Sequence, residues 1–186
     1  MAQPRVLENK AGKGTEWSRG KDDGELLFCF KNMNEIRTES VRDNGNRQII
    51  QAFGQEGHVL VSSKETGDAF CILRIIASPT SITPPHLHRE TDETFVIESG
   101  EIEMNRGGEL IYGQKGDVIY LPRGVPHAPR ALGTEDLTVL VICVPGGFDR
   151  FFTACGEEFK KGNPDLQVLD NLAREYGIEF IVPPLS

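Results

Sequence analysis

Hydrophobic and polar residues alternate in short runs through the middle of the chain. From Val59 onward, runs rich in β-branched residues are separated by clusters of Gly, Asp, Asn and Ser, a spacing typical of a β-sandwich or small barrel. The predicted strands are 59–62, 69–77, 94–97, 101–105, 110–112, 118–121, 128–131 and 137–144. The pattern therefore predicts an all-β fold.

The last of these runs, LTVLVICV at 137–144, is apolar at both alternate sets of positions. Because successive side chains of a strand point to opposite faces, both of its faces must be covered. One face suits a barrel interior, and the other can meet the N-terminal arm or a second copy of the chain. We therefore expect a homodimer.

The two ends of the chain have other patterns. Residues 1–57 are polar and Gly-rich, with apolar patches at 26–30 and 49–50, and are expected to form an arm of one or two strands that packs on a barrel at 58–147. Residues 148–186 are predicted to form a helical extension. Phe148, Phe151 and Phe152 share a helical face there. Asn163-Pro164-Asp165 predicts a helix start and Gly177 its end, within one structural domain.

Composition excludes several classes of protein. At 186 residues the chain suits one domain, and its net charge of −8 opposes nucleic-acid or anionic-membrane partners, which require clustered Lys and Arg. Neither a signal-peptide segment nor a run of 18 apolar residues is found, so a cytoplasmic location is expected. The cysteines lack zinc-site spacing and are expected to be buried free thiols: Cys29, Cys71, Cys143 and Cys155.

Three of the four histidines fall in one pattern with a glutamate: His86, His88, Glu93 and His127. Residues two apart in a strand point the same way, so His86 and His88 can both face the interior. Glu93 lies at an odd offset from His88, so residues 89–92 must form a turn before Glu93 can face inward. Pro122 and Gly124 bend the chain so that His127 begins a neighbouring strand.

An isolated histidine is usually a surface group or a hydrogen-bonded core group. Burying three imidazoles and a carboxylate together is unfavourable, however, unless a cation compensates all of them. The pattern therefore predicts a divalent transition-metal site with Glu93 as ligand or general base. Iron, manganese, nickel, cobalt, copper and zinc all accept such ligands, so the metal stays open.

The motifs Pro85-His86-x-His88-x4-Glu93-x6-Gly100 and Gly116-x5-Pro122-x-Gly124-x2-His127 resemble the two motifs of the cupin superfamily. Thr80 and Ala131 stand where the family's leading Gly and trailing Asn would be. The resemblance implies a single double-stranded β-helix, or jelly-roll barrel, with the three histidines and Glu93 at the metal-ligand positions. Residues 145–152 more loosely resemble single-barrel cupins of the quercetinase-like group, and they could either pack as an ordinary helix or cover the pocket.

This resemblance implies a metal-dependent dioxygenase-like oxidoreductase that acts, with O2, on a small enolisable or aromatic molecule such as a flavonol or diketone. A non-redox isomerase, cyclase, dehydratase or decarboxylase is the alternative, and a non-catalytic small-molecule-binding cupin is the second. An apolar pocket is expected to draw on Phe95, Ile97, Met104, Ile119, Tyr120 and Leu121. Substrate oxygens could meet Tyr112, Tyr120 or Arg130.

Overall fold

The computed structural model describes residues 6–8, 15–17, 49–81 and 83–181. The chain divides into two compact units, 1–43 and 44–186. In the first, β1 (Val6–Glu8) pairs with antiparallel β2 (Thr15–Trp17). The predicted patch at 26–30 and Cys29 lie outside the described residues.

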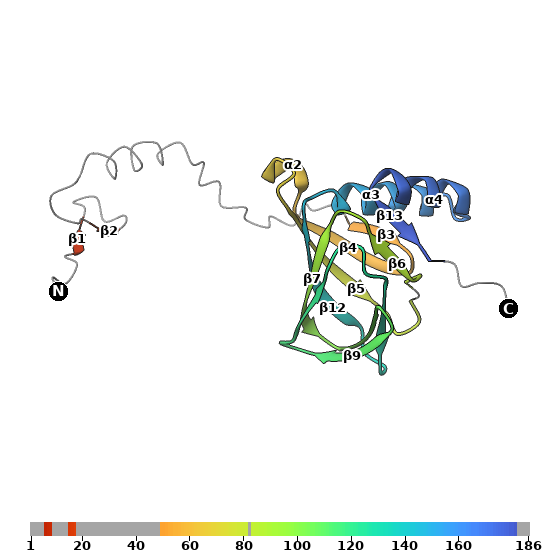
Figure 1. Cartoon of the computed structure of the whole chain (residues 1–186), viewed down its shortest axis with the longest axis horizontal. Helices are drawn as coiled ribbons and strands as arrows, with labels where there is room; N and C mark the ends of the chain where they lie inside the picture. Colours follow the sequence, from red (N-terminus) through yellow and green to blue (C-terminus); the bar gives the residue numbers. More distant parts are fainter. Residues whose placement is uncertain (1–5, 9–14, 18–48, 82, 182–186) are drawn as a thin grey trace. The chain divides into compact units, whose positions relative to one another are not determined.

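The second unit is built from two antiparallel sheets that face each other (Figure 1). The first has the order β10 (Val118–Leu121), β7 (Asp92–Ser99), β12 (Leu137–Val144), β5 (Cys71–Ala77), β4 (Gln55–Val61) and β3 (Ile49–Ala52). The second has the order β13 (Ile178–Phe180), β6 (His86–His88), β11 (His127–Leu132), β8 (Glu101–Arg106) and β9 (Glu109–Gln114). The all-β prediction is confirmed, and β13, which pairs with β6, is an addition to it.

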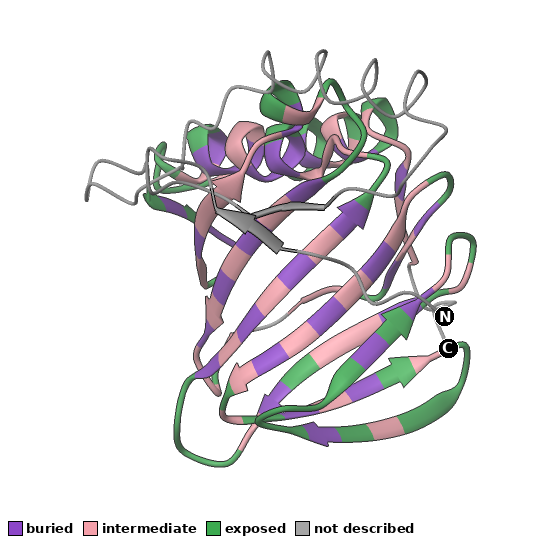
Figure 2. Cartoon of the chain, turned by 90° about the vertical axis from the view of Figure 1, so that its left-hand side faces the viewer, coloured by how far each residue is buried: buried purple, intermediate pink, exposed green. Residues whose placement is uncertain are grey.

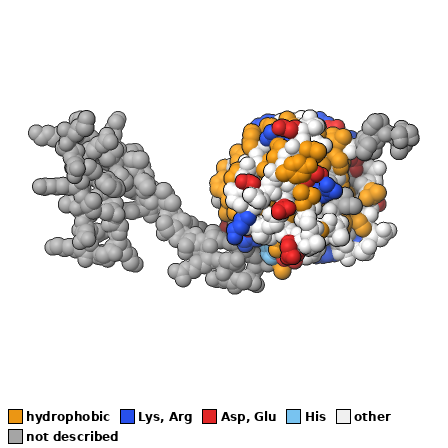
Figure 3. Space-filling model, turned by 90° about the horizontal axis from the view of Figure 1, so that it is seen from below, with side chains coloured by type: hydrophobic (Ala, Val, Ile, Leu, Met, Phe, Trp, Pro, Cys, Tyr) orange, Lys and Arg blue, Asp and Glu red, His pale blue; other side chains and the backbone are white. Residues whose placement is uncertain are grey.

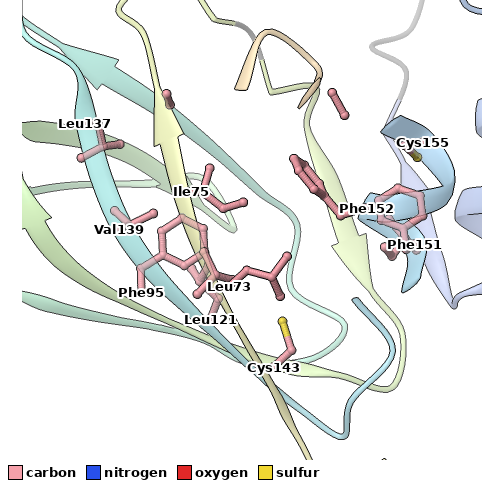
Figure 4. Close-up of a cluster of buried hydrophobic side chains, with 14 of the residues drawn as sticks. Leu73, Ile75, Phe95, Leu121, Leu137, Val139, Cys143, Phe151, Phe152 and Cys155 are labelled. Atoms are coloured by element: carbon pink, nitrogen blue, oxygen red, sulfur yellow. The ribbon is translucent and has the colours of Figure 1, made fainter. Parts of the chain in front are cut away.

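Burial alternates along the strands, as Figure 2 shows. In β5 every second residue from Cys71 to Ala77 is buried, and β12 follows the same period from Leu137 to Cys143. The inward side chains pack between the sheets and include Leu73, Phe95 and Val139 (Figure 4). The outward residues Thr138, Leu140 and Ile142 of β12 are only half-buried, so this apolar face is incompletely covered by the described residues.

Among the described residues, three helices accompany the sheets: α2 (Ser63–Thr66), α3 (Phe148–Phe159) and α4 (Leu166–Glu175). Figure 1 shows α3 and α4 together at one end of the barrel, where α3 packs on β3 and α4 on β13. Gly57 of β4 permits this packing, because a Cβ there would overlap the Phe152 ring. None of the described helices is long and apolar enough to span a membrane. On the face shown in Figure 3, the Lys and Arg side chains are scattered among acidic and hydrophobic ones.

The predicted C-terminal helices are confirmed, with a correction at the start of α4. Asp165 is the N-cap, and its carboxylate accepts hydrogen bonds from the backbone N–H groups of Gln167 and Val168. Pro164 therefore precedes the helix instead of occupying its first turn. Gly177, with φ of 71°, follows the helix and redirects the chain into β13.

Candidate metal centre

The predicted site residues come together from both sheets. His86 and His88 are buried on β6 with Leu87 turned the other way, and His127 on β11 lies directly opposite His86. Glu93 comes from β7 of the facing sheet. The site therefore bridges the two layers of the barrel.

The turns around the site are fixed by hydrogen bonds. A bend at Arg89–Glu90 separates β6 from β7 and lets Glu93 face inward, as predicted. Arg123 donates through Nη2 to Asp92 Oδ2 at 2.7 Å and through its backbone N–H to Asp92 Oδ1 at 2.9 Å. Gly124, with φ of 75°, donates its backbone N–H to the His88 carbonyl at 2.7 Å. The turn before His127 is thus bonded to β6 and β7, the two strands that carry the other three residues.

The four side chains offer one potential ligand atom each, and these atoms lie within 4.8 Å of one another. Glu93 Oε2 is 3.2 Å from His127 Nε2 and 3.7 Å from His88 Nε2. These three atoms are also the buried side-chain polar atoms that have no hydrogen-bond partner among the described residues. Buried polar atoms are normally paired, so their convergence on one space indicates a missing common partner.

Hydrogen bonds at Nδ1 determine how the imidazoles of His86 and His127 are oriented. His86 Nδ1 lies 2.8 Å from the Pro84 carbonyl, and His127 Nδ1 lies 3.1 Å from the Val125 carbonyl. A carbonyl only accepts hydrogen bonds, so Nδ1 carries the proton in each ring. The lone pairs on Nε2 are therefore directed toward the shared space, as metal-binding histidines require.

Burial and mutual repulsion control the charges. Burial, together with repulsion from His127 and His88, lowers the pKa of His86 to about 3, and burial also lowers the pKa of His88. Burial opposes ionisation of Glu93, but the surrounding histidines outweigh it and lower its pKa to about 2. Burial likewise opposes the charged form of His127, while Glu93 outweighs it and raises the pKa of His127. The Glu93 carboxylate is thus ionised near neutral pH.

This donor set fits a divalent transition metal. Metal–nitrogen and metal–oxygen bonds of about 2.1 Å place neighbouring donors of an octahedron about 3.0 Å apart and opposite donors about 4.2 Å apart. The observed spacing needs only small inward shifts to reach these values. Three imidazoles and one carboxylate would leave two coordination positions for other molecules.

A cavity lies beside the cluster. His86 is 9% exposed, against 2–3% for the other three residues, so the site is reached past His86. The cavity is lined by Gln55, Ile75, Ala77, Ser81, Thr83, His86, Glu93, Phe95, Pro129, Arg130, Ala131, Leu137, Val139, Val141 and Phe148. Most of these side chains are apolar, which suits a substrate with little charge.

Some predicted pocket residues lie elsewhere. Phe95 lines the cavity, whereas Ile97, Met104, Ile119 and Leu121 are core residues. Tyr112 and Tyr120 are 64% and 50% exposed, and neither lines the cavity, because their strand neighbours occupy the inward positions. Arg130 does line it, although its guanidinium donates to Glu103 at 2.8 Å.

The sequence interpretation did not include Gln55 and Thr83 among the cavity residues. Gln55 lies in the segment taken as an arm, and Thr83 in a loop without periodicity. Phe148 lies in residues 145–152, for which the sequence left both helix packing and a pocket-covering role open, and it lines the cavity. The spacing of Phe148, Phe151 and Phe152 predicts a helix. It does not indicate which cavity the three rings line.

Comparisons with known proteins show what this chain resembles. Residues 74–143 match the family model described as "Cupin domain". Quercetin 2,3-dioxygenase of Bacillus subtilis is 30% identical over 79 residues, which are 42% of this chain and only 23% of that protein. The uncharacterized protein SCO3923 of Streptomyces coelicolor is 30% identical over 90 residues, covering 48% of this chain and 82% of that protein.

Among solved structures, an RmlC-like cupin from Shewanella frigidimarina has a TM-score of 0.52 at 16% identity. The match covers 61% of this chain and 96% of that structure. At this identity the likeness concerns the fold alone, and it confirms the predicted jelly-roll barrel.

Proposed function

Because this chain belongs to the cupin family, we propose that His86, His88, Glu93 and His127 hold a divalent transition metal in a dioxygenase that acts on a small enolisable or aromatic molecule. The observation that carries the proposal is the convergence of three unpartnered buried atoms, His88 Nε2, Glu93 Oε2 and His127 Nε2, on one space. A cation is the partner that would satisfy two imidazole nitrogens and a carboxylate oxygen at once.

The bound ion would supply Lewis acidity toward a hydroxyl or enol oxygen of the substrate. Glu93 would serve either as a ligand or, detached from the ion, as the acceptor of the proton that this oxygen loses, because its Oε2 faces the same space as the imidazole nitrogens. The histidines, fixed by Pro84 and Val125, orient the reacting group. Phe148 and the apolar barrel wall exclude water from the electron-rich substrate, which then reacts with O2.

Two observations support the dioxygenase class. The cavity wall is largely apolar, which suits an uncharged organic substrate. The quercetin 2,3-dioxygenase relative acts by its name on a flavonol, although this chain spans about a quarter of its length. A flavonol and a diketone share the adjacent oxygen atoms that two open coordination positions can bind.

The test is oxygen uptake by the purified chain loaded separately with iron, manganese, nickel, cobalt, copper or zinc. Quercetin and acetylacetone serve as substrates, and the metal-stripped chain is the control. Uptake that requires both metal and substrate would support the proposal. Turnover that is unchanged under anaerobic conditions would favour a non-redox isomerase, cyclase, dehydratase or decarboxylase instead. Metal-dependent binding with no turnover would favour a binding protein.

A further inference from the structure

A second pocket adjoins the cavity at the candidate metal centre. Its apolar wall consists of Phe53, Phe148, Phe151, Phe152, Ile178 and Phe180. These residues come from the β3–β4 turn, α3 and β13, which are far apart in sequence. Figure 4 shows Phe151 and Phe152 on α3, beside the barrel strands. We call this the phenylalanine pocket.

The phenylalanine pocket and the metal-centre cavity share a wall. Gln55, Thr83, His86 and Phe148 line both of them. The Phe180 ring meets the His86 ring edge-on at 6.5 Å, and the Phe148 ring lies 5.6 Å from the His88 ring. The two pockets therefore lie side by side at His86 and Phe148.

Phe53 adopts a backbone conformation that its own side chain disfavours. Its φ is 55°, followed by 72° at Gly54, in a two-residue turn closed by the Ala52–Gln55 pair. Asn-Gly is the favoured sequence for such a turn, and a bulky residue at positive φ is an outlier. The turn nevertheless presents a phenyl ring, 6.2 Å from the Phe180 ring and 6.5 Å from the Phe151 ring. Backbone strain that is retained in a folded protein, such as the positive φ of Phe53, is often found at ligand-binding sites.

The chemistry of the walls defines the ligand part that fits. The described lining of the phenylalanine pocket has no Asp, Glu, Lys or Arg. At the shared wall, Gln55 donates through Nε2 to Thr83 Oγ1 at 2.5 Å, so the Thr83 hydroxyl can itself donate to a ligand oxygen. An uncharged aromatic ring suits the phenyl walls, and an oxygen atom suits the junction.

We infer that the phenylalanine pocket is an aryl subsite, and that the substrate is an aryl-substituted enol or diketone whose oxygen atoms lie at the metal centre. The inference rests on the proposed function for the metal-bound end of the molecule. The aryl end is recognised by Phe53 and Phe180, independently of the metal.

The experiment compares two ligands that differ by one ring. Acetylacetone and 1-phenylbutane-1,3-dione are titrated by calorimetry, without oxygen, into the full chain loaded with nickel. Phe53→Asn keeps a turn-compatible residue and removes the ring, and Phe180→Leu shortens a second wall. Each should weaken the phenyl ligand about tenfold relative to acetylacetone, the effect of losing roughly one aromatic contact.

Phe159→Leu is the matched control, because the Phe159 ring meets the Phe53 ring edge-on at 5.0 Å without lining the pocket. This variant should leave the ratio of the two affinities unchanged. Equal weakening of both ligands in the two test variants, or no change in the ratio, would overturn the subsite.

If neither diketone binds the unmodified nickel-loaded chain, that result counts against the diketone chemistry of the proposed function. The subsite is then judged with benzyl alcohol, titrated into the metal-free chain and followed by NMR. Shifts at Phe53 and Phe180 that disappear in Phe53→Asn support the aryl subsite. Absence of binding, or binding that is unchanged in that variant, refutes it.

Discussion

Cys143 and Glu93 are directly opposite each other on β12 and β7, and the Cys143 thiol donates a hydrogen bond to Glu93 Oε1 with Sγ at 3.7 Å. Both side chains are at most 2% exposed. Burial raises the pKa of the Cys143 thiol, so the group stays protonated and remains a donor. The contact leaves Oε2 directed at His88 and His127. Cys143 thus orients the carboxylate of the candidate metal centre.

Replacing this thiol should weaken metal binding without removing a ligand. Cys143→Ala is expected to lower metal affinity about tenfold or more, as loss of a group that orients a ligand does, while Cys143→Ser restores a donor and most of the affinity. Chelator competition measures the effect. Cys155→Ala, a buried thiol on α3, is the control. Equal affinities for the parent chain and Cys143→Ala would show that the contact is incidental.

Removing one imidazole should abolish stoichiometric binding. His88→Ala is expected to lose most of the bound metal and all metal-dependent turnover. The reason is that His88 Nε2 faces the shared space and has no hydrogen-bond partner among the described residues. His58→Ala is the matched control, since His58 lies on β4 with its Nε2 2.7 Å from Glu56 Oε1. Elemental analysis of both variants gives the result. A full complement of metal in His88→Ala contradicts the assignment.

Neutralising the carboxylate should separate binding from chemistry. Glu93→Gln keeps an oxygen in place but can no longer accept a proton, so the variant is expected to retain part of the metal and to lose turnover by about a hundredfold or more. Metal content and the rate constant per bound metal are measured together. Full activity per bound metal would exclude Glu93 as the base.

The metal-free chain should lose stability on acidification. Unfolded histidine titrates near pH 6.5, whereas the pKa of His86 in the folded chain is about 3 and that of His88 is also lowered. Between pH 6.5 and 3 the unfolded state therefore binds more protons. The free energy of unfolding should fall by up to about 1.4 kcal/mol per pH unit for each such histidine.

Two other groups modify this slope. The raised pKa of His127 gives stability below neutral pH and partly offsets the loss. The lowered pKa of Glu93 adds a further loss from about pH 4.5 down to about pH 2. Urea unfolding in EDTA at pH 7 and pH 4.5 measures the net effect. His86→Phe should reduce the dependence on pH, and an unchanged slope in that variant would contradict burial of the His86 imidazole as its cause.

The outward face of β12 should mediate self-association. Leu140 and Ile142 are apolar and half-buried there, and the homodimer expected from the sequence stays a prediction. Leu140→Glu places a charge on this face and is expected to convert a dimer into a monomer. Thr138→Ser, on the same face, is the control. Analytical ultracentrifugation at micromolar concentration measures the oligomeric state of each variant. A monomeric parent chain would contradict the homodimer hypothesis.

The sequence by itself determined the features that depend on local geometry. Side-chain direction in a strand has a period of two, so the inward positions of β5 and β12 and the common side of His86 and His88 could be read directly. The odd offset of Glu93 likewise required the bend that the structure has at Arg89–Glu90. The four candidate ligands were identifiable because few histidines are present and their spacing is regular.

Only the tertiary structure decided which side chains meet across the barrel. Cys143 opposes Glu93 because of the register between β12 and β7, and a pairing between residues 50 positions apart leaves no local trace in the sequence. The phenylalanine pocket likewise forms where a turn, a helix and the terminal strand pack together. The physical reason is that backbone periodicity sets the direction of a side chain, whereas its neighbours depend on how distant segments pack.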